Sequence, residues 1–222
     1  MSAQPEDLAT TLTPGPVTPD DVRTASRWLA DGVARHPDAA FDAQAGPVRW
    51  SCWATAEHVV DDLLAYALQV AGLPLLDYLP LAGPKGEDEI AHVKREAGPA
   101  GLAEVIVAGG ELLAAQVAAR PPTARAYHPY GLSDPEGFAA MGVAEILVHG
   151  RDVFQGLTGT SPTLPEGLSA RVLARLFPDL PPTVLDLPPD DALVWATGRS
   201  DLPGLPRRTR WRWDASVRQP AA

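Results

Sequence analysis

Hydrophobic residues recur at intervals of three and four along most of this chain, and that spacing is typical of helices that bury one face. Cap residues and prolines bound the runs, since the residue before a proline avoids helical geometry. The pattern predicts long helices over residues 20–36, 55–71 (or from 51), 101–120 and 134–157, with a shorter one over 89–96. Four long helices joined by turns predict a mainly α fold, a four-helix bundle.

The pattern changes in the last third of the chain. Residues 165–177 predict one extra amphipathic helix, and a proline-rich stretch follows. Beyond it, ALVWAT (192–197) and RTRWRW (208–213) predict two strands of a small C-terminal β-hairpin, because Trp211 and Trp213 alternate with arginines. We therefore expect a mobile leader at 1–19, the bundle at 20–160, and an appendage of helix and hairpin at 161–222.

Composition narrows the class of protein. A formal net charge of −10 argues against a nucleic-acid partner, because phosphate binding relies on clustered Lys and Arg. The single cysteine, Cys52, excludes an internal disulfide and fits a reducing compartment. No secretory leader opens the chain, and no apolar stretch approaches the length that spans a bilayer. These features predict a soluble cytoplasmic protein with no membrane partner, as a monomer or a homodimer.

The helix predicted over 134–157 carries two polar residues that are unusual for a core helix. Glu145 and His149 are four residues apart and share a face, and Asp152 follows one turn later. A buried carboxylate needs a partner, and a metal ion shared with His149 is one candidate. The pair alone is a weak signal, because a solvated acid beside a satisfied histidine is the commoner arrangement.

A third candidate ligand lies on the second predicted helix. His58 is in its first turn, and Asp61 or Asp62 could orient the imidazole or face water. Inward side chains of facing helices can build a metal site in a bundle. His58, Glu145 and His149 would leave at least one coordination position for water or substrate, as in catalytic zinc sites.

Two further stretches are candidates for function. The loop before the last long helix holds Tyr127, His128 and Tyr130, which could line a pocket for a cofactor or merely pack as a lid. Cys52 lies between Trp50 and Trp53 and could be a nucleophile at a helix start, although a small buried apolar residue is the preferred interpretation.

Two segments carry a family resemblance. WSCWATAEHVVDDL (50–63) and AEILVHGRDV (144–153) are together similar to the metal-binding pattern of the DinB-like superfamily, closest to the mycothiol-dependent maleylpyruvate isomerase group. In that group a histidine early in the second helix joins a Glu-x-x-x-His pair on the fourth, with an aspartate shortly after. His58, Glu145, His149 and Asp152 stand at those places, and the resemblance spans roughly residues 20–157.

The resemblance implies a DinB-like bundle, a divalent metal, most often zinc, and mycothiol as the low-molecular-weight thiol. A metal-bound thiolate would attack a small electrophile, giving either isomerisation or thiol transfer. An arginine from the C-terminal part would hold a substrate carboxylate, with Arg199 of the TGR segment as first candidate and Arg210 as second. The C-terminal region here is short compared with the larger domain of the isomerases, which leaves the substrate open.

Two other functions stay open at this point. Two histidines and one carboxylate also match the facial triad of non-haem Fe(II) enzymes, so an oxidative DinB-like activity is one alternative. A non-catalytic helical module with a structural metal, or none, is the other.

Overall fold

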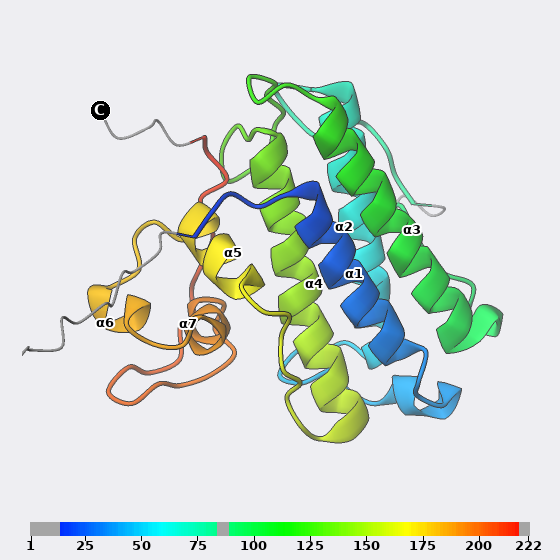
Figure 1. Ribbon diagram of the computed structural model, residues 1–222. Helices are drawn as coiled ribbons and strands as arrows, with labels where there is room; N and C mark the ends of the chain where they lie inside the picture. The colour runs from blue at the N-terminus through cyan, green and yellow to red at the C-terminus, as the bar shows by residue number, and fades with distance from the viewer. Residues whose placement is uncertain (1–13, 84–88, 218–222) are drawn as a thin grey trace, which may run out of the picture.

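The computed structural model describes residues 14–83 and 89–217, and its regular elements are helices (Figure 1). The four longest are α1 (Pro19–Val33), α2 (Cys52–Gly72), α3 (Gly98–Ala119) and α4 (Pro135–Thr158). The others are α5 (Leu168–Leu176), α6 (Pro182–Leu185), α7 (Pro189–Ala196) and two 3₁₀ turns, η1 (Asp38–Asp42) and η2 (Arg95–Ala97). The predicted mainly α class is confirmed.

The four long helices pack as a bundle. α1 and α2 each lie against both α3 and α4, and α5 packs on the outer side of α4 (Figure 1). α4 is buried along most of its length, because it is enclosed by α1, α2, α3 and α5. Any polar side chain on the middle of α4 is therefore held inside the bundle.

Side-chain caps fix where these helices begin. The side chain of Thr18 accepts a hydrogen bond from the Asp21 N–H in a capping box, and Ser51 caps α2 in the same way. Asp134 accepts from Gly137 N–H at the start of α4, with Pro135 at the next position. The first turns of α1, α2 and α4 are thus capped by Thr18, Ser51 and Asp134.

Two glycines let α4 approach its neighbours closely. A Cβ added at Gly142 would lie 2.5 Å from Cδ2 of Leu113 on α3 and 3.3 Å from Cδ2 of Leu63 on α2. A Cβ added at Gly150 would lie 2.6 Å from Cζ3 of Trp28 on α1. All three distances are below ordinary van der Waals contact, so these positions set the spacing between α4 and the rest of the bundle.

The prediction of a C-terminal β-hairpin was wrong. Among the described residues there is no strand, and 192–197 belongs largely to α7. The Pro188-Pro189-Asp190-Asp191 stretch is a helix start, with proline and acidic residues in the first turn, and a short apolar run cannot distinguish strand from helix.

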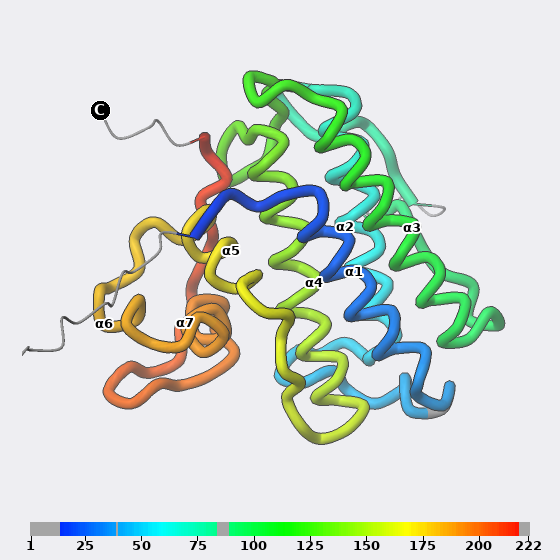
Figure 2. The backbone as a smooth tube through the Cα atoms, in the orientation of Figure 1, coloured from blue at the N-terminus to red at the C-terminus, as the bar shows by residue number. Residues whose placement is uncertain are grey.

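Residues 208–213 lie in an extended tail that pairs with no second strand. This tail runs back along α5 toward the loop that precedes α4 (Figure 2). Asp214 N–H donates to Leu176 O, and Ala215 N–H donates to Tyr130 O, so its backbone is tied to both elements. The extra helix over 165–177 is confirmed as α5, whereas the proposed division at residue 160 remains a prediction.

The prediction of a helix over 89–96 was also wrong. Residues 89–94 carry no regular structure, and only η2 forms at their end. Side chains of α2 hold this segment instead: Asp61 Oδ1 accepts from the N–H groups of Ile90 and Ala91, and Glu57 Oε1 accepts from Val93 N–H. Those bonds take backbone donors that a helix would use internally.

One sequence prediction concerns the N-terminal leader. Residues 1–13 of the predicted leader lie outside the described residues, and Val17, near the end of the leader, is buried with its N–H donating to Glu136.

The statement that no stretch approaches membrane-spanning length was wrong: Arg95–Ala119 is long and apolar enough by length and composition. In this fold its apolar positions pack against α1 and α2 as a core helix does.

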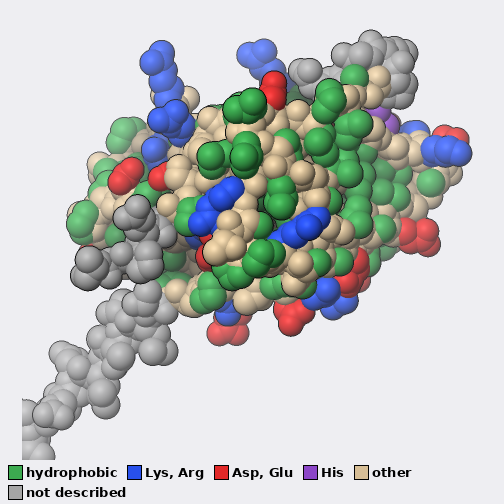
Figure 3. All heavy atoms as spheres, turned by 90° about the horizontal axis from the view of Figure 1, so that it is seen from above, with side chains coloured by type: hydrophobic (Ala, Val, Ile, Leu, Met, Phe, Trp, Pro, Cys, Tyr) green, Lys and Arg blue, Asp and Glu red, His purple; other side chains and the backbone are tan. Residues whose placement is uncertain are grey.

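Charged side chains lie on the surface between hydrophobic ones, with several Asp and Glu along one edge of the view from above (Figure 3).

Cys52 is buried, and burial raises the pKa of its thiol to about 11. A nucleophilic role is thereby disfavoured, in line with the preferred interpretation of this cysteine.

Candidate metal centre

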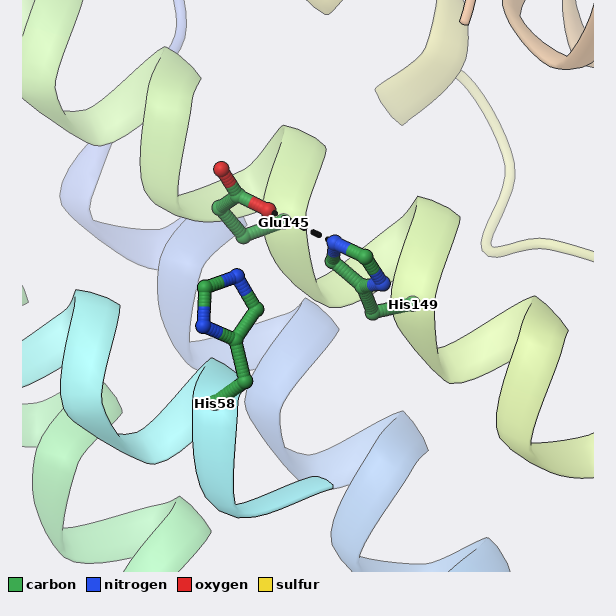
Figure 4. Close-up of side chains that lie close together, drawn as sticks. All are labelled: His58, Glu145 and His149. Carbon is green, nitrogen blue, oxygen red and sulfur yellow. Dashed lines mark ion pairs between the residues drawn. The ribbon is translucent and has the colours of Figure 1, made fainter. Parts of the chain in front are cut away.

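His58, Glu145 and His149 converge between α2 and α4. His58 projects from the start of α2, and Glu145 and His149 project from the middle of α4 toward the same space (Figure 4). One ligand atom from each lies within 4.8 Å of the others. The rings of the two histidines are 5.1 Å apart between centroids. The structure thus brings together the three predicted ligands, although 87 residues separate the first from the second.

These separations suit one small cation. Zinc binds nitrogen and oxygen at about 2.0–2.2 Å, so two ligands of one ion lie at most about 4.4 Å apart. Nε2 of His149 is 3.3 Å from Oε2 of Glu145, already within this limit. A small side-chain rotation of His58 would complete the set.

Asp152 lies behind His149. Its Oδ2 is 3.6 Å from Nδ1 of His149, and its side chain is fully buried. With a cation bound, a carboxylate facing Nδ1 would favour a proton there and leave the lone pair of Nε2 for the cation. The predicted proximity of Asp152 to the histidine is therefore present in the structure.

Arg199 pairs with Asp152. Its Nε and Nη2 donate to Oδ2 of Asp152 at 3.2 and 3.0 Å, and its Nη1 donates to Thr197 O at 2.8 Å. Gly198, at φ +68°, ends α7 in the left-handed region and turns Arg199 back toward α4. All three guanidinium nitrogens are thus engaged within the protein. Three of its five N–H groups are used in these bonds, and the predicted role of holding a substrate carboxylate stays a prediction.

Carboxylates flank the two nitrogens of His58. Oδ2 of Asp62 is 3.2 Å from Nε2, and Oε1 of Glu89 is 3.3 Å from Nδ1. Asp61 instead holds the backbone of residues 90 and 91. Of the two predicted orienting residues, Asp62 contacts the imidazole and Asp61 serves the neighbouring segment.

The cluster carries excess negative charge. Glu145, Asp62, Glu89 and Asp152 bring four carboxyl groups, whereas the arginines that pair with Asp152, Arg199 and Arg151, bring two positive charges, so with every group ionised the balance is −4 + 2 = −2. A divalent cation would neutralise that difference.

The acids respond differently to this environment. Burial raises the pKa of Asp62 well above its ordinary value, and the charge of Glu145 raises it further. Burial would also raise the pKa of Glu145, but its hydrogen bond with His149 and the charges of both histidines outweigh burial and lower it. Glu145 is thus anionic at neutral pH and suited to bind a cation.

Several buried polar atoms of the cluster lack a hydrogen-bond partner among the described residues. These are Nδ1 of His58, Oδ2 of Asp62, Nδ1 of His149 and Oδ1 of Asp152. Buried polar groups without partners cost free energy, and in native proteins they mark water, ion or ligand positions. The donor set, the charge and these atoms together fit a bound divalent metal.

A cavity of about 380 Å³ adjoins the cluster. Asp62 and Tyr66 lie in its wall, and both touch the cluster, since the hydroxyl of Tyr66 donates to Oε1 of Glu145 at 3.5 Å. Tyr78, Leu79 and Leu81 close its outer side. Among the residues that the structure describes, 14–83 and 89–217, no Lys or Arg lines this cavity.

Trp50 lies beside both imidazoles. Its ring centroid is 4.9 Å from that of His58 and 6.4 Å from that of His149, while 44% of the residue is exposed. Trp50 therefore partly separates the cluster from solvent at the start of α2.

The predicted cofactor-binding loop divides between two places. His128 is buried, with its ring 6.1 Å from Tyr66, and Tyr127 lies against Tyr78 at 5.7 Å. Tyr130 lines a second cavity with Arg210 instead. None of the three loop residues lines the cavity beside the metal cluster, and neither does Arg210, so their predicted ligand contacts remain untested.

Protonation of His128 is expected to destabilise the fold. Burial lowers the pKa of His128 from 6.5 to about 4. Between these values the unfolded chain binds a proton that the folded chain does not, so acid favours unfolding by about 3 kcal/mol in total. We expect the urea midpoint of the wild type to fall more between pH 7 and pH 4.5 than that of His128→Gln. Glutamine keeps an acceptor for Tyr130 N–H, and equal slopes for the two proteins would refute the prediction.

Sequence reasoning missed Tyr66, Glu89 and Trp50. Tyr66 had a visible signal, because His58, Asp62 and Tyr66 recur every four residues on one face of α2. Glu89 had none, since its approach depends on the contacts that hold the following residues to α2. Trp50 precedes the helix, and only the turn before Ser51 brings it to the cluster.

Comparison with known proteins adds no relative: no family model, no curated protein and no solved structure matches this chain.

Proposed function

We propose that this protein is a metal-dependent enzyme that activates a small thiol and directs its sulfur onto a small electrophile. The observation that carries the proposal is the convergence of His58, Glu145 and His149 from two facing helices beside a cavity. Two imidazoles and one carboxylate leave a coordination position open, as catalytic zinc requires. The resemblance to DinB-like, mycothiol-dependent isomerases supports mycothiol as the thiol.

Each residue around the ligands has a defined part in this proposal. Asp152 keeps the proton of His149 on Nδ1, and Arg199 holds Asp152 in place. Tyr66 occupies Oε1 of Glu145, which leaves Oε2 for the cation. A divalent cation held there would supply the Lewis acidity that keeps a thiol deprotonated at neutral pH.

The cavity beside Asp62 and Tyr66 is the proposed entry for thiol and electrophile. Its volume of about 380 Å³ is in the range of small-molecule sites. Because its described lining holds two aspartates and no basic residue, a dicarboxylate such as maleylpyruvate would find no counter-charge among those side chains. We therefore favour an uncharged electrophile, and thiol transfer over isomerisation of a dianion. The reducing cytoplasm, which keeps thiols free, is the proposed location.

Metal analysis followed by cobalt substitution tests the proposal. We expect purified protein to hold about one zinc per chain, and the Co(II)-substituted protein to develop a sulfur-to-cobalt charge-transfer band when mycothiol is added. His58→Ala should show no such band, whereas His36→Ala, a histidine at the end of α1, should behave as the wild type.

The outcomes separate the three candidate functions. Zinc with a thiol-dependent band supports thiol chemistry. Bound iron with oxygen consumption would instead support the oxidative DinB-like activity. Absence of metal after purification and after addition of Zn²⁺ would leave the non-catalytic helical module.

A further inference from the structure

The C-terminal tail forms one wall of a second cavity, larger than the one beside the metal cluster. Its volume is about 760 Å³, which is in the range of sites for drug-sized ligands. The other walls are the loop at 129–131 and the end of α5 with the residues that follow it. The lining contains none of the proposed metal ligands, so the proposed thiol chemistry makes no use of this cavity.

The lining of this cavity is basic in an acidic protein. Arg208, Arg210 and Arg212 face it, against Asp179 and Asp214, giving a balance of 3 − 2 = +1 where the whole chain carries −10. Oδ1 of Asp214 already accepts from Ser216 N–H. Arg210 and Arg212 are exposed and form no hydrogen bond or ion pair with any described residue. Their guanidinium groups are therefore available to an anion.

Arg208 is held differently from the other two. Its Nη1 donates to Ala196 O, and its guanidinium lies 5.4 Å from the ring centroid of Trp195. This arginine is fixed against α7, so it gives the cavity a positioned charge beside two exposed ones.

Aromatic rings form the rest of the lining. The rings of Trp211 and Trp213 are 6.0 Å apart, and that of Tyr130, which is 42% exposed, is 6.0 Å from Trp213. Rings with open faces beside arginines bind flat molecules by stacking and cation–π contact.

An unpartnered donor points to a ligand independently of charge. Trp213 is 8% exposed, and its buried Nε1 has no hydrogen-bond partner among the described residues. A buried indole N–H normally finds an acceptor. An oxygen of a molecule bound in this cavity would supply one.

We propose that this cavity binds a small organic anion with a flat ring: the ring packs against Trp211 and Tyr130, and a carboxylate or phosphate pairs with Arg210 and Arg212. Trp213 Nε1 donates to an oxygen of the same ligand. Aromatic carboxylates and nucleotides share this chemistry, so both belong in the test.

Calorimetric titration of the full chain tests this assignment. The probes are 2-naphthoate, AMP and inorganic phosphate. Arg210→Gln with Arg212→Gln should weaken binding of the organic anion at least about tenfold, since two charge-assisted contacts are lost. Arg35→Gln with Arg49→Gln removes two exposed arginines elsewhere and serves as the matched control. Trp213→Phe keeps a ring but removes the N–H, and should weaken binding about two- to tenfold.

Every outcome is decisive. Binding of 2-naphthoate or AMP that the cavity variant loses and the control keeps supports the proposal, and the tighter probe identifies the anionic group. No binding of either at millimolar concentration would overturn it, as would equal affinity in the cavity variant and the wild type. Phosphate binding as tightly as AMP would also overturn it, because the rings would then contribute nothing.

Discussion

His149→Ala is expected to leave the protein without stoichiometric metal. The wild type should retain about one divalent ion per chain after dialysis, and the variant less than a tenth of that. The reason is geometric: Nε2 of His149 lies 3.3 Å from Oε2 of Glu145, and without it only Glu145 and His58 remain. Two protein ligands hold zinc far more weakly than the three of a catalytic site. Elemental analysis of both proteins measures the difference.

Folding of the variant has to be checked separately. Circular dichroism would show whether the bundle survives, and His149→Gln offers a second variant closer in volume. His36→Ala removes a histidine outside the cluster and should keep full metal content. Retention of a full equivalent by folded His149→Ala would exclude this residue as a ligand.

Arg199→Ala is expected to lower the free energy of unfolding by about 3 kcal/mol, the lower end of the usual cost of breaking a buried ion pair, because Arg151 stays 4.0 Å from Asp152. Asp152 is fully buried, and Arg199 supplies two of its hydrogen bonds. Removing Arg199 should also weaken metal binding, because Asp152 faces Nδ1 of His149. Mutation of a residue that holds a metal ligand in place typically lowers metal affinity about 10–100-fold. Urea unfolding of the metal-free protein separates the two effects.

Two comparison variants sharpen this test. Arg210→Ala removes an exposed arginine of the C-terminal tail and should change stability by less than about 0.5 kcal/mol. Arg199→Met combined with Asp152→Asn removes both charges and should recover part of the lost stability, because no unpaired charge stays buried. If Arg199→Ala unfolds like Arg210→Ala, the ion pair contributes nothing to the fold.

The sequence was sufficient for the bundle because its signals are local. Cap residues such as Ser51 and Asp134 and apolar spacing place the starts of the long helices within a few residues. The three residues of the candidate metal site could also be named in advance. Glu145 and His149 share a face by helical period alone, but their meeting with His58 required the family pattern, since nothing local in the sequence relates α2 to α4.

The C-terminal third could not be predicted in the same way. The run at 192–197 is apolar and short, and α7 forms because Pro189 and two aspartates begin a helix whose apolar side packs on α5. Alternation of Trp and Arg at 208–213 predicted a strand, but a strand also needs a pairing partner. The tail finds Leu176 and Tyr130 instead, one backbone bond each.

The location of Arg199 could be predicted from the sequence, but its bonding partners could not. The TGR segment was the first candidate for a functional arginine, and the structure does bring it to the metal cluster through Asp152. Its guanidinium nitrogens are all occupied inside the protein, so its position came from the sequence pattern while its bonding depended on tertiary contacts.

Gly142 and Gly150 bracket the ligands on α4, three residues before Glu145 and one after His149. A side chain at either position would act as a wedge that drives α4 away from Leu63 on one side or from Trp28 on another. Since two of the proposed ligands lie on α4 and the third lies on α2, such a side chain would increase the distance between the ligands that one ion has to bind. Selection for tighter metal affinity would consequently act on two residues that never touch the ion, and libraries built to improve it should hold both glycines constant.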